Sequence, residues 1–352
     1  MEDEHYMAMA IKLASKGHTS PNPMVGAVIV KDGKIIGEGF HEGPGLPHAE
    51  INALEGVDAK DSTLFVSLEP CSHFGRTPPC TDAIISAGVS RVVCAMEDPN
   101  PLVSGIEVLR ETGIEVDVGV LEDAARKLNE SFIKYMETGM PFVTLKSAMS
   151  LDGKISTNSG DSKWITSSYS RKYSRDLRAR NDAILVGVNT VLKDDPRLRS
   201  DIGKDPLRII LDSKLSSPLD SKVYEDGNVL VATTSACSEK KIGLFRDRGI
   251  EVVVCGDDSV DVIKLAAMLG KRGITSIIVE GGSDVNASFV RSGIVDKLLF
   301  FIAPKLIGGR TSPGPIGGEG IESMEQIIKL RGMRLEPLDG DMLIEAYPDQ
   351  SR

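Results

Sequence analysis

The residues best suited to chemistry in this sequence are one histidine, one glutamate and two cysteines. His48 and Glu50 stand in Pro47-His48-Ala49-Glu50, while Cys71 follows Glu69-Pro70 and Cys80 follows Pro79. Histidine nitrogen and cysteine thiolate are preferred zinc ligands, and three protein ligands leave a tetrahedral zinc one position for water, as in catalytic sites. We therefore expect one catalytic zinc per chain, bound by His48, Cys71 and Cys80.

Glu50 is the expected acid and base of this site. A His-x-Glu pattern with two later cysteines is typical of zinc enzymes that deaminate nucleobases, and in these the glutamate does not bind the metal. Zinc lowers the pKa of its bound water to about 7, and Glu50 would pass that water's proton to the departing amine. The alternative is a closed structural zinc with His73 as its fourth ligand. The glutamate beside the histidine favours catalysis.

Two helix starts would bring these residues together. In the middle of a helix, residues two apart point to nearly opposite sides, so His48 and Glu50 converge only where a helix begins, and Pro47 indicates such a start. A second helix is expected from Thr81, and a helix N-terminus lowers the pKa of a thiol such as Cys80. Residues 72–79 separate the two cysteines, in place of a short Cys-x-x-Cys.

The composition predicts an ordinary two-domain protein. A chain of 352 residues suffices for two cores, and we place the boundary at Thr138-Gly139, giving domains 1–139 and 140–352. The net charge of −10 argues against a nucleic-acid partner. We see no apolar run of membrane-spanning length and no signal peptide, and expect a cytoplasmic protein without a membrane partner. Cys94, Cys237 and Cys255 are expected to be unpaired thiols.

Hydrophobic periodicity predicts alternating helices and strands in both domains, an α/β fold class. In the first domain we expect helices at 6–15, 48–55, 81–87, 104–111 and 122–137, and strands at 26–31, 34–38, 63–67, 89–95 and 115–118. In the second we expect strands at 206–212, 229–233, 250–255, 276–280 and 297–303, and helices at 264–272 and 284–291.

Several segments resemble the RibD (RibG) family of bifunctional riboflavin-biosynthesis proteins. Residues 21–30, His48-Ala49-Glu50 and residues 69–80 resemble its deaminase half. Residues 146–155, 184–191, 194–196 and 279–282 resemble its reductase half, so the resemblance covers nearly the whole chain. It implies an N-terminal cytidine-deaminase-like zinc domain and a C-terminal dihydrofolate-reductase-like domain that binds NADPH. We also expect a homo-oligomer.

The resemblance implies two reactions on a phosphorylated pyrimidine. The first domain would deaminate 2,5-diamino-6-(5-phosphoribosylamino)pyrimidin-4(3H)-one, with Asn22 hydrogen-bonded to the ring. The second would reduce the ribosyl group to ribityl with NADPH, and Lys146 and Glu280 would polarise or protonate the sugar. Two alternatives stay open: a nucleic-acid-editing zinc deaminase with an appended domain, which the acidic charge disfavours, and a non-catalytic structural zinc module.

The cofactor site is expected at a glycine turn. No Gly-x-Gly-x-x-Gly follows a strand, but Glu280-Gly281-Gly282 lies between a predicted strand and helix, where backbone N–H groups can approach a phosphate. The resemblance implies NADPH contacts at Ala148, Trp164, Thr190, Asp194, Gly281, Gly282, Ser283, Asp284, Val285, Asn286, Ala287 and Ser288. Taken alone, the glycine pair could be an ordinary tight turn, and Trp164 a core aromatic residue.

The substrate of the reductase half would meet Lys146, Ser162, Arg178, Leu198 and Glu280, by the same resemblance. Arg178 would grip the substrate phosphate, whereas Arg171, Lys172, Arg175 and Arg180 are interpreted mostly as a solvated helix face. The family usually has Leu-Thr-x-Arg after Asp-Asp-Pro. Here Asp201 stands at the arginine position, and Arg199 is the candidate replacement. His5, His18 and His41 are expected on the surface or in loops, with His41 near enough to His48 to border its pocket.

Overall fold

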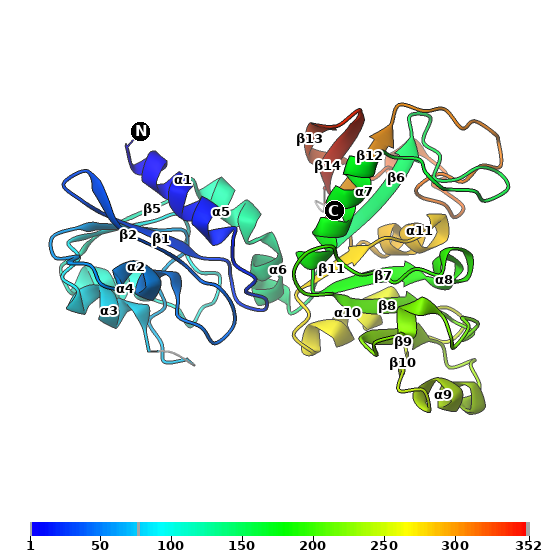
Figure 1. Ribbon diagram of the computed structural model, residues 1–352, viewed down its shortest axis with the longest axis horizontal. Helices are drawn as coiled ribbons and strands as arrows, with labels where there is room; N and C mark the ends of the chain where they lie inside the picture. The colour runs from blue at the N-terminus through cyan, green and yellow to red at the C-terminus, as the bar shows by residue number, and fades with distance from the viewer. Residues whose placement is uncertain (1, 76–77, 350–352) are drawn as a thin grey trace. The chain divides into compact units, whose positions relative to one another are not determined.

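The computed structural model describes residues 2–75 and 78–349, so that Arg76 and Thr77 of the segment between the zinc-site cysteines lie outside the described residues. The chain forms two compact units, Met1–Gly139 and Met140–Arg352. Each unit is a sheet flanked by helices, so the α/β class is confirmed (Figure 1). In the described part of the chain no helix is long and apolar enough to cross a membrane.

The first unit contains a five-stranded sheet. Its antiparallel part pairs β1 (Gly26–Lys31) with β2 (Lys34–Phe40) and with β3 (Thr63–Val66). β4 (Arg91–Cys94) and β5 (Glu115–Val118) then continue parallel to β3. The β1–β2 turn is tight because Asp32 and Gly33 both have positive φ, which suits the twist of a hairpin.

Helices cover both faces of this sheet. α1 (Glu2–Ala14) and α5 (Glu122–Leu128) lie on one face, and α2 (Ala49–Leu54), α3 (Cys80–Ser86) and α4 (Gly105–Glu111) on the other (Figure 1). Fully buried strand residues such as Ile29, Leu64 and Val92 form the core between them. α2 begins directly after His48 and packs against α3, which begins at Cys80. His48 and Cys80 therefore lie at two neighbouring helix starts, and Cys71 lies in the loop that precedes α3.

The single helix predicted at 122–137 is wrong, because the chain breaks at Asn129 into α5 and α6 (Glu130–Thr138). The Asn129 side chain is buried and accepts a bond from the Met24 N–H at 2.8 Å through Oδ1. It also donates to the Met24 carbonyl at 2.9 Å through Nδ2. This paired bond ties the break between the two helices to the segment next to Asn22, and residues of α6 line the first cavity.

The second unit is built on a nine-stranded sheet with the order β10-β9-β8-β7-β11-β6-β12-β14-β13. Seven strands run parallel: β6 (Phe142–Ser150), β7 (Ala183–Gly187), β8 (Leu207–Leu211), β9 (Val229–Thr233), β10 (Glu251–Val254), β11 (Ser276–Val279) and β12 (Lys297–Ala303). β14 (Asp341–Pro348) pairs antiparallel with β12 and with the edge strand β13 (Leu330–Leu338).

Two hydrophobic clusters cover the faces of this second sheet. α10 (Val262–Lys271) and α11 (Ser283–Ser292) contribute to one. α7 (Ser168–Ala179), α8 (Val188–Asp194) and α9 (Glu239–Arg246) contribute to the other. Because parallel strands end at a common edge, the turns after β7 and β11 lie side by side, which is where α/β sheets bind ligands.

Candidate active sites

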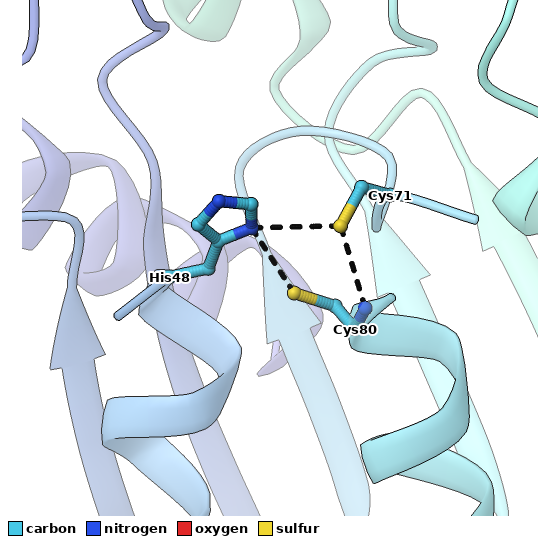
Figure 2. Close-up of side chains that lie close together, drawn as sticks. All are labelled: His48, Cys71 and Cys80. Atoms are coloured by element: carbon cyan, nitrogen blue, oxygen red, sulfur yellow. Dashed lines mark hydrogen bonds between the residues drawn. The ribbon is translucent and has the colours of Figure 1, made fainter. Parts of the chain in front are cut away.

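His48, Cys71 and Cys80 meet at one point, as Figure 2 shows. The Nδ1 atom of His48 lies 3.2 Å from the Cys80 sulfur and 3.5 Å from the Cys71 sulfur. Among the described residues, these three form the group of His, Cys, Asp and Glu side chains close enough to hold a metal ion, with ligand atoms within 4.8 Å of one another. His73, the fourth ligand of the structural alternative, is exposed and outside the group. Three protein ligands fit a catalytic zinc.

The local charges also favour metal binding. The Cys80 backbone N–H, in the first turn of α3, donates to the Cys71 sulfur at 3.3 Å. A hydrogen bond between the two cysteine side chains lowers the pKa of the Cys71 thiol to about 4. That side-chain bond raises the pKa of the Cys80 thiol, as does burial. The pair thus shares one negative charge, and a zinc ion would favour the ionised form of both sulfurs.

Glu50 lies in the first turn of α2 and is only 3% exposed. Burial raises the pKa of its carboxyl to about 7. Glu50, His48 and Cys71 line a cavity of about 460 Å³ in the first unit. A carboxyl group with a pKa near neutrality can take up and release a proton without a large free-energy cost, so its position and its pKa suit proton transfer.

His41 and Asn22 form a hydrogen-bonded pair in the wall of this cavity. His41 Nδ1 lies 3.0 Å from the Pro47 carbonyl, which can only accept, so Nδ1 donates. Burial lowers the pKa of His41, and in its neutral form Nε2 accepts from Asn22 Nδ2 at 3.2 Å. This bond fixes the amide of Asn22 and leaves its Oδ1 for a ligand N–H. His41 borders the zinc pocket as predicted, and it is buried.

Several other residues that line the first cavity were not predicted from the sequence. Glu69 is buried and accepts from the N–H groups of Asp98 at 3.1 Å and Ile106 at 3.0 Å, which fixes the loop beside Cys71. Phe132, Tyr135 and Met136 extend from α6 into the lining. These α6 side chains reach the cavity after the helix break at Asn129. The only sign of that break in the sequence is one polar residue within a long helical pattern.

A second cavity, of about 420 Å³, lies in the second unit. Its lining includes Lys146, Arg178 and Glu280. Arg178 donates to both oxygens of Glu280, through Nε and Nη2, each at 2.9 Å. Lys146 Nζ lies 3.8 Å from Glu280 Oε2. The guanidinium of Arg178 therefore binds a carboxylate of the protein itself, where the sequence predicted that it binds the substrate phosphate.

The pKa values of Glu280 and Lys146 in this cluster are shifted from their ordinary values. Burial raises the pKa of Glu280, but the positive charges of Arg178 and Lys146 outweigh it and bring the pKa to about 2. Burial lowers the pKa of Lys146, and Glu280 opposes that shift. Shifted groups of this kind, gathered in a cavity, are typical of catalytic sites.

The turn after β11 fits a phosphate-bearing cofactor. A side-chain Cβ at Gly282 would meet nothing within 4 Å, so the space in front of it is open to a ligand. At Gly281 a Cβ would lie 2.5 Å from Val285 Cγ1, so packing against α11 requires that glycine. Asn286 is buried, and its Oδ1 has no hydrogen-bond partner among the described residues. An open cradle at a helix start and an unpaired buried acceptor both suit a polar ligand.

The remaining predicted residues fall into two sets. Ala148, Ser162 and Trp164 line the second cavity. Trp164 is 64% exposed, which rules out a core aromatic residue. The others lie outside that lining: Thr190 and Asp194 on α8, and Ser283, Asp284, Val285, Asn286, Ala287 and Ser288 on α11, where Ala287 is buried.

Two predicted substrate residues lie apart from the cavity lining. Leu198 is buried in the hydrophobic cluster beneath α7 and α8. Arg199 pairs with Asp226 at 3.0 Å and with Asp205 at 3.8 Å. Conversely, Arg171 and Arg175 were expected on a solvated helix face, and both line the cavity. That expectation is wrong for these two residues because one face of α7 borders the cavity.

Two protein-family models match the chain. The model described as the cytidine and deoxycytidylate deaminase zinc-binding region matches residues 1–96. The model described as the RibD C-terminal domain matches residues 141–344. The first match contains His48, Glu50, Cys71 and Cys80, and the second contains Lys146, Arg178 and Glu280.

Individual relatives match over nearly the full length. Riboflavin biosynthesis protein RibD of Aquifex aeolicus is 47% identical over 97% of each chain. RibD of Escherichia coli is 43% identical, over 88% of this chain and 89% of its own. The structure is similar to Acinetobacter baumannii RibD (38% identity, TM-score 0.89, 99% of each chain). It is also similar to the Thermotoga maritima diaminohydroxyphosphoribosylaminopyrimidine deaminase/5-amino-6-(5-phosphoribosylamino)uracil reductase (40% identity, TM-score 0.87, 99% of each chain).

Proposed function

Because this chain belongs to the RibD family of riboflavin biosynthesis proteins, we propose that its two cavities divide the family's two reactions between them. The chain is a bifunctional enzyme, a zinc-dependent pyrimidine deaminase and an NADPH-dependent reductase. We assign deamination to residues 1–139 and reduction to residues 140–352. The two family matches support this division because each lies within one compact unit.

In the first cavity the substrate is 2,5-diamino-6-(5-phosphoribosylamino)pyrimidin-4(3H)-one, which loses its 2-amino group as ammonia. Zinc bound by His48, Cys71 and Cys80 would make water acidic enough to supply hydroxide near neutral pH. Glu50 receives a proton at its buried carboxylate and returns it to the nitrogen of the leaving amine. Asn22 Oδ1, held by His41, accepts a hydrogen bond from the pyrimidine ring.

In the second cavity the ribosyl group of the deaminated product is reduced to ribityl. NADPH would be held by the Gly281-Gly282 turn and the start of α11, with Ala148 and Trp164 beside it, and would supply the hydride. Lys146 donates its proton to the sugar oxygen, and the ionised Glu280 keeps Lys146 in place. Ser162 hydrogen-bonds the substrate from the cavity wall.

The observation that carries the deaminase assignment is the group of three metal ligands beside the buried Glu50 in one cavity. Glu50→Gln should reduce deamination by about a thousandfold, since Gln keeps the shape but cannot accept the proton. Zinc content, measured by atomic emission, should stay at one per chain, and reduction of the deaminated substrate should be unchanged.

Glu55→Gln is the matched control, because Glu55 is an exposed residue at the end of the same helix and should leave both activities unchanged. Loss of zinc together with deamination in Glu50→Gln would contradict the assigned role, since Glu50 would then be a ligand or a structural residue.

We also propose a homo-oligomer in the cytoplasm, acting on small molecules without nucleic acid or membrane. Edge strand β13 supports self-association, since Leu330, Met333 and Leu335 are about half exposed or more on a strand with one free edge. The cysteines are free thiols, in keeping with a reducing compartment. Light scattering should give a mass above one chain, and cell fractionation tests the location.

A further inference from the structure

The lining of the second cavity is strongly basic. It contains Lys146, Arg171, Arg175 and Arg178 and a single acidic residue, Glu280. The three arginines are spaced i, i+4 and i+7 along α7, which places them on one face of that helix. On the proposed function, on which this inference rests, the substrate of this cavity carries a phosphate. A phosphate dianion needs N–H groups that are not already bound within the protein.

Three of the four cations are already engaged. Arg178 donates to Glu280 through Nε and Nη2 and to the Arg199 carbonyl through Nη1 at 3.0 Å, and only 15% of its side chain is exposed. Lys146 is held between Glu280 and the Phe301 ring, 5.4 Å from its centroid.

Arg171 is held by aromatic stacking and a hydrogen bond. Its guanidinium lies 4.5 Å from the centroid of the Trp164 ring, and its Nη1 donates to the Thr166 carbonyl at 2.6 Å. These contacts restrict the guanidinium of Arg171. Arg178 and Lys146 are restricted in the same way, so none of the three can easily turn toward a phosphate.

Arg175 is different. Its Nε donates to Asp201 Oδ2 at 2.6 Å, and 39% of each of the two side chains is exposed. Within the described residues, its Nη1 and Nη2 make no hydrogen bond. A guanidinium fixed through Nε presents the N–H groups of its opposite edge, and such groups bind phosphate oxygens in pairs. The Ser174 hydroxyl beside it in the lining is also buried without a partner among the described residues.

We propose that Arg175 binds the substrate phosphate in the reductase cavity and that Asp201 orients its guanidinium. The RibD resemblance places an arginine at position 201, where this chain has Asp201, whereas Arg199 is paired with Asp226 and Asp205. In this chain position 201 instead carries a carboxylate, which pairs with the guanidinium of Arg175 on α7. Arg175 thus selects the phosphorylated substrate over its dephosphorylated form.

The test measures reductase kinetics on the deaminated substrate with and without its phosphate. Arg175→Gln should raise the KM for the phosphorylated substrate by about 10- to 100-fold, the usual loss for a charge-assisted hydrogen bond. The kcat, the KM for NADPH and the kinetics on the dephosphorylated substrate should change little. Lys172→Gln, an exposed lysine of the same helix, removes the same charge and should change nothing.

A rescue experiment separates binding from folding. Asp201→Arg in the Arg175→Gln background returns a guanidinium to the opposite side of the ion pair and should restore most of the lost affinity. Inorganic phosphate should compete with the phosphorylated substrate in the wild type and much less in Arg175→Gln.

The inference is overturned if Arg175→Gln affects both substrates equally, if it leaves the KM for the phosphorylated substrate unchanged, or if a folded double variant shows no rescue. A wild-type protein that reduces neither substrate would instead overturn the proposed reductase function itself.

Discussion

At the scale of single residues, the reductase cavity depends on one charge cluster. Glu280 remains ionised because Arg178 and Lys146 offset the cost of its burial. Its pKa is lowered from 4.5 to about 2, so the stability that this ionised carboxylate contributes is fully present above pH 4.5 and is lost as the pH falls toward 2. Near neutral pH, Glu280 therefore acts as a fixed negative charge beside Lys146.

This charge predicts the pH dependence of reduction. Lys146 donates in its protonated form, so kcat/KM should fall as the pH rises through its pKa, which burial places below 10.5. Glu280 raises that pKa, so Glu280→Gln should move the alkaline limb to lower pH, in addition to lowering the rate. The pH profile of the residual activity measures this shift. A limb that stays in place would mean that another group titrates.

The residues predicted for the zinc site lie together in the structure, whereas two residues predicted for the reductase substrate lie outside its cavity lining. His48, Cys71 and Cys80 could be proposed because metal ligands are restricted to a few residue types, and Glu50 because it stands two residues after the histidine. The sequence placed Leu198 and Arg199 at the substrate, but Leu198 lies in the core and Arg199 pairs with other acids. Spacing along a chain does not show which way a basic side chain points, and α7 carries basic residues both on its cavity face and on its exposed face.

At the scale of elements, strands and helices with clear hydrophobic periodicity were predicted well. β5 has the predicted bounds, and β1 and β2 flank the predicted turn. α1 begins earlier than predicted because Glu2, Asp3 and Glu4 suit the positive end of a helix.

The strands and helices that were not predicted lack a clear sequence pattern because of where they lie in the fold. β6, β7, β13, β14, α8 and α9 were not predicted, and α7 was expected only as a helix face without bounds. β7 is buried throughout and β13 is almost wholly exposed, so neither shows the alternating pattern of a half-buried strand. The break at Asn129 depends on Met24, which is remote in the sequence.

The glycine turn after β11 gives a prediction at this scale. Gly282→Val should raise the KM for NADPH by at least about tenfold, since its side chain would fill the space left for the cofactor. Deamination and the melting temperature should not change, because no protein atom lies within 4 Å of the new Cβ. Cofactor binding can be followed by quenching of Trp164, the only tryptophan.

Gly281→Val is the matched comparison, and it should lower the melting temperature because its Cβ would overlap Val285. Normal NADPH binding by Gly282→Val would show that the turn is an ordinary connection between strand and helix.

At the scale of the whole molecule, the chain is two compact units that meet in sequence at Gly139 and Met140. The predicted boundary depended on Thr138-Gly139-Met140-Pro141, and Gly139 ends α6 with a φ of 68°, a conformation that glycine adopts without strain. Each unit has its own core and its own cavity. The two reactions should therefore be separable in one preparation of the intact protein.

The most direct test is to remove zinc from the wild-type protein with a chelator and to measure both reactions on the same sample. Deamination of the phosphorylated diaminopyrimidine should stop and should return when zinc is restored, because His48, Cys71 and Cys80 hold the metal in the first unit only. Reduction of the already deaminated substrate by NADPH should continue at its original rate. An equal loss of both activities would contradict the account, since it would mean that the two reactions share one zinc-dependent site.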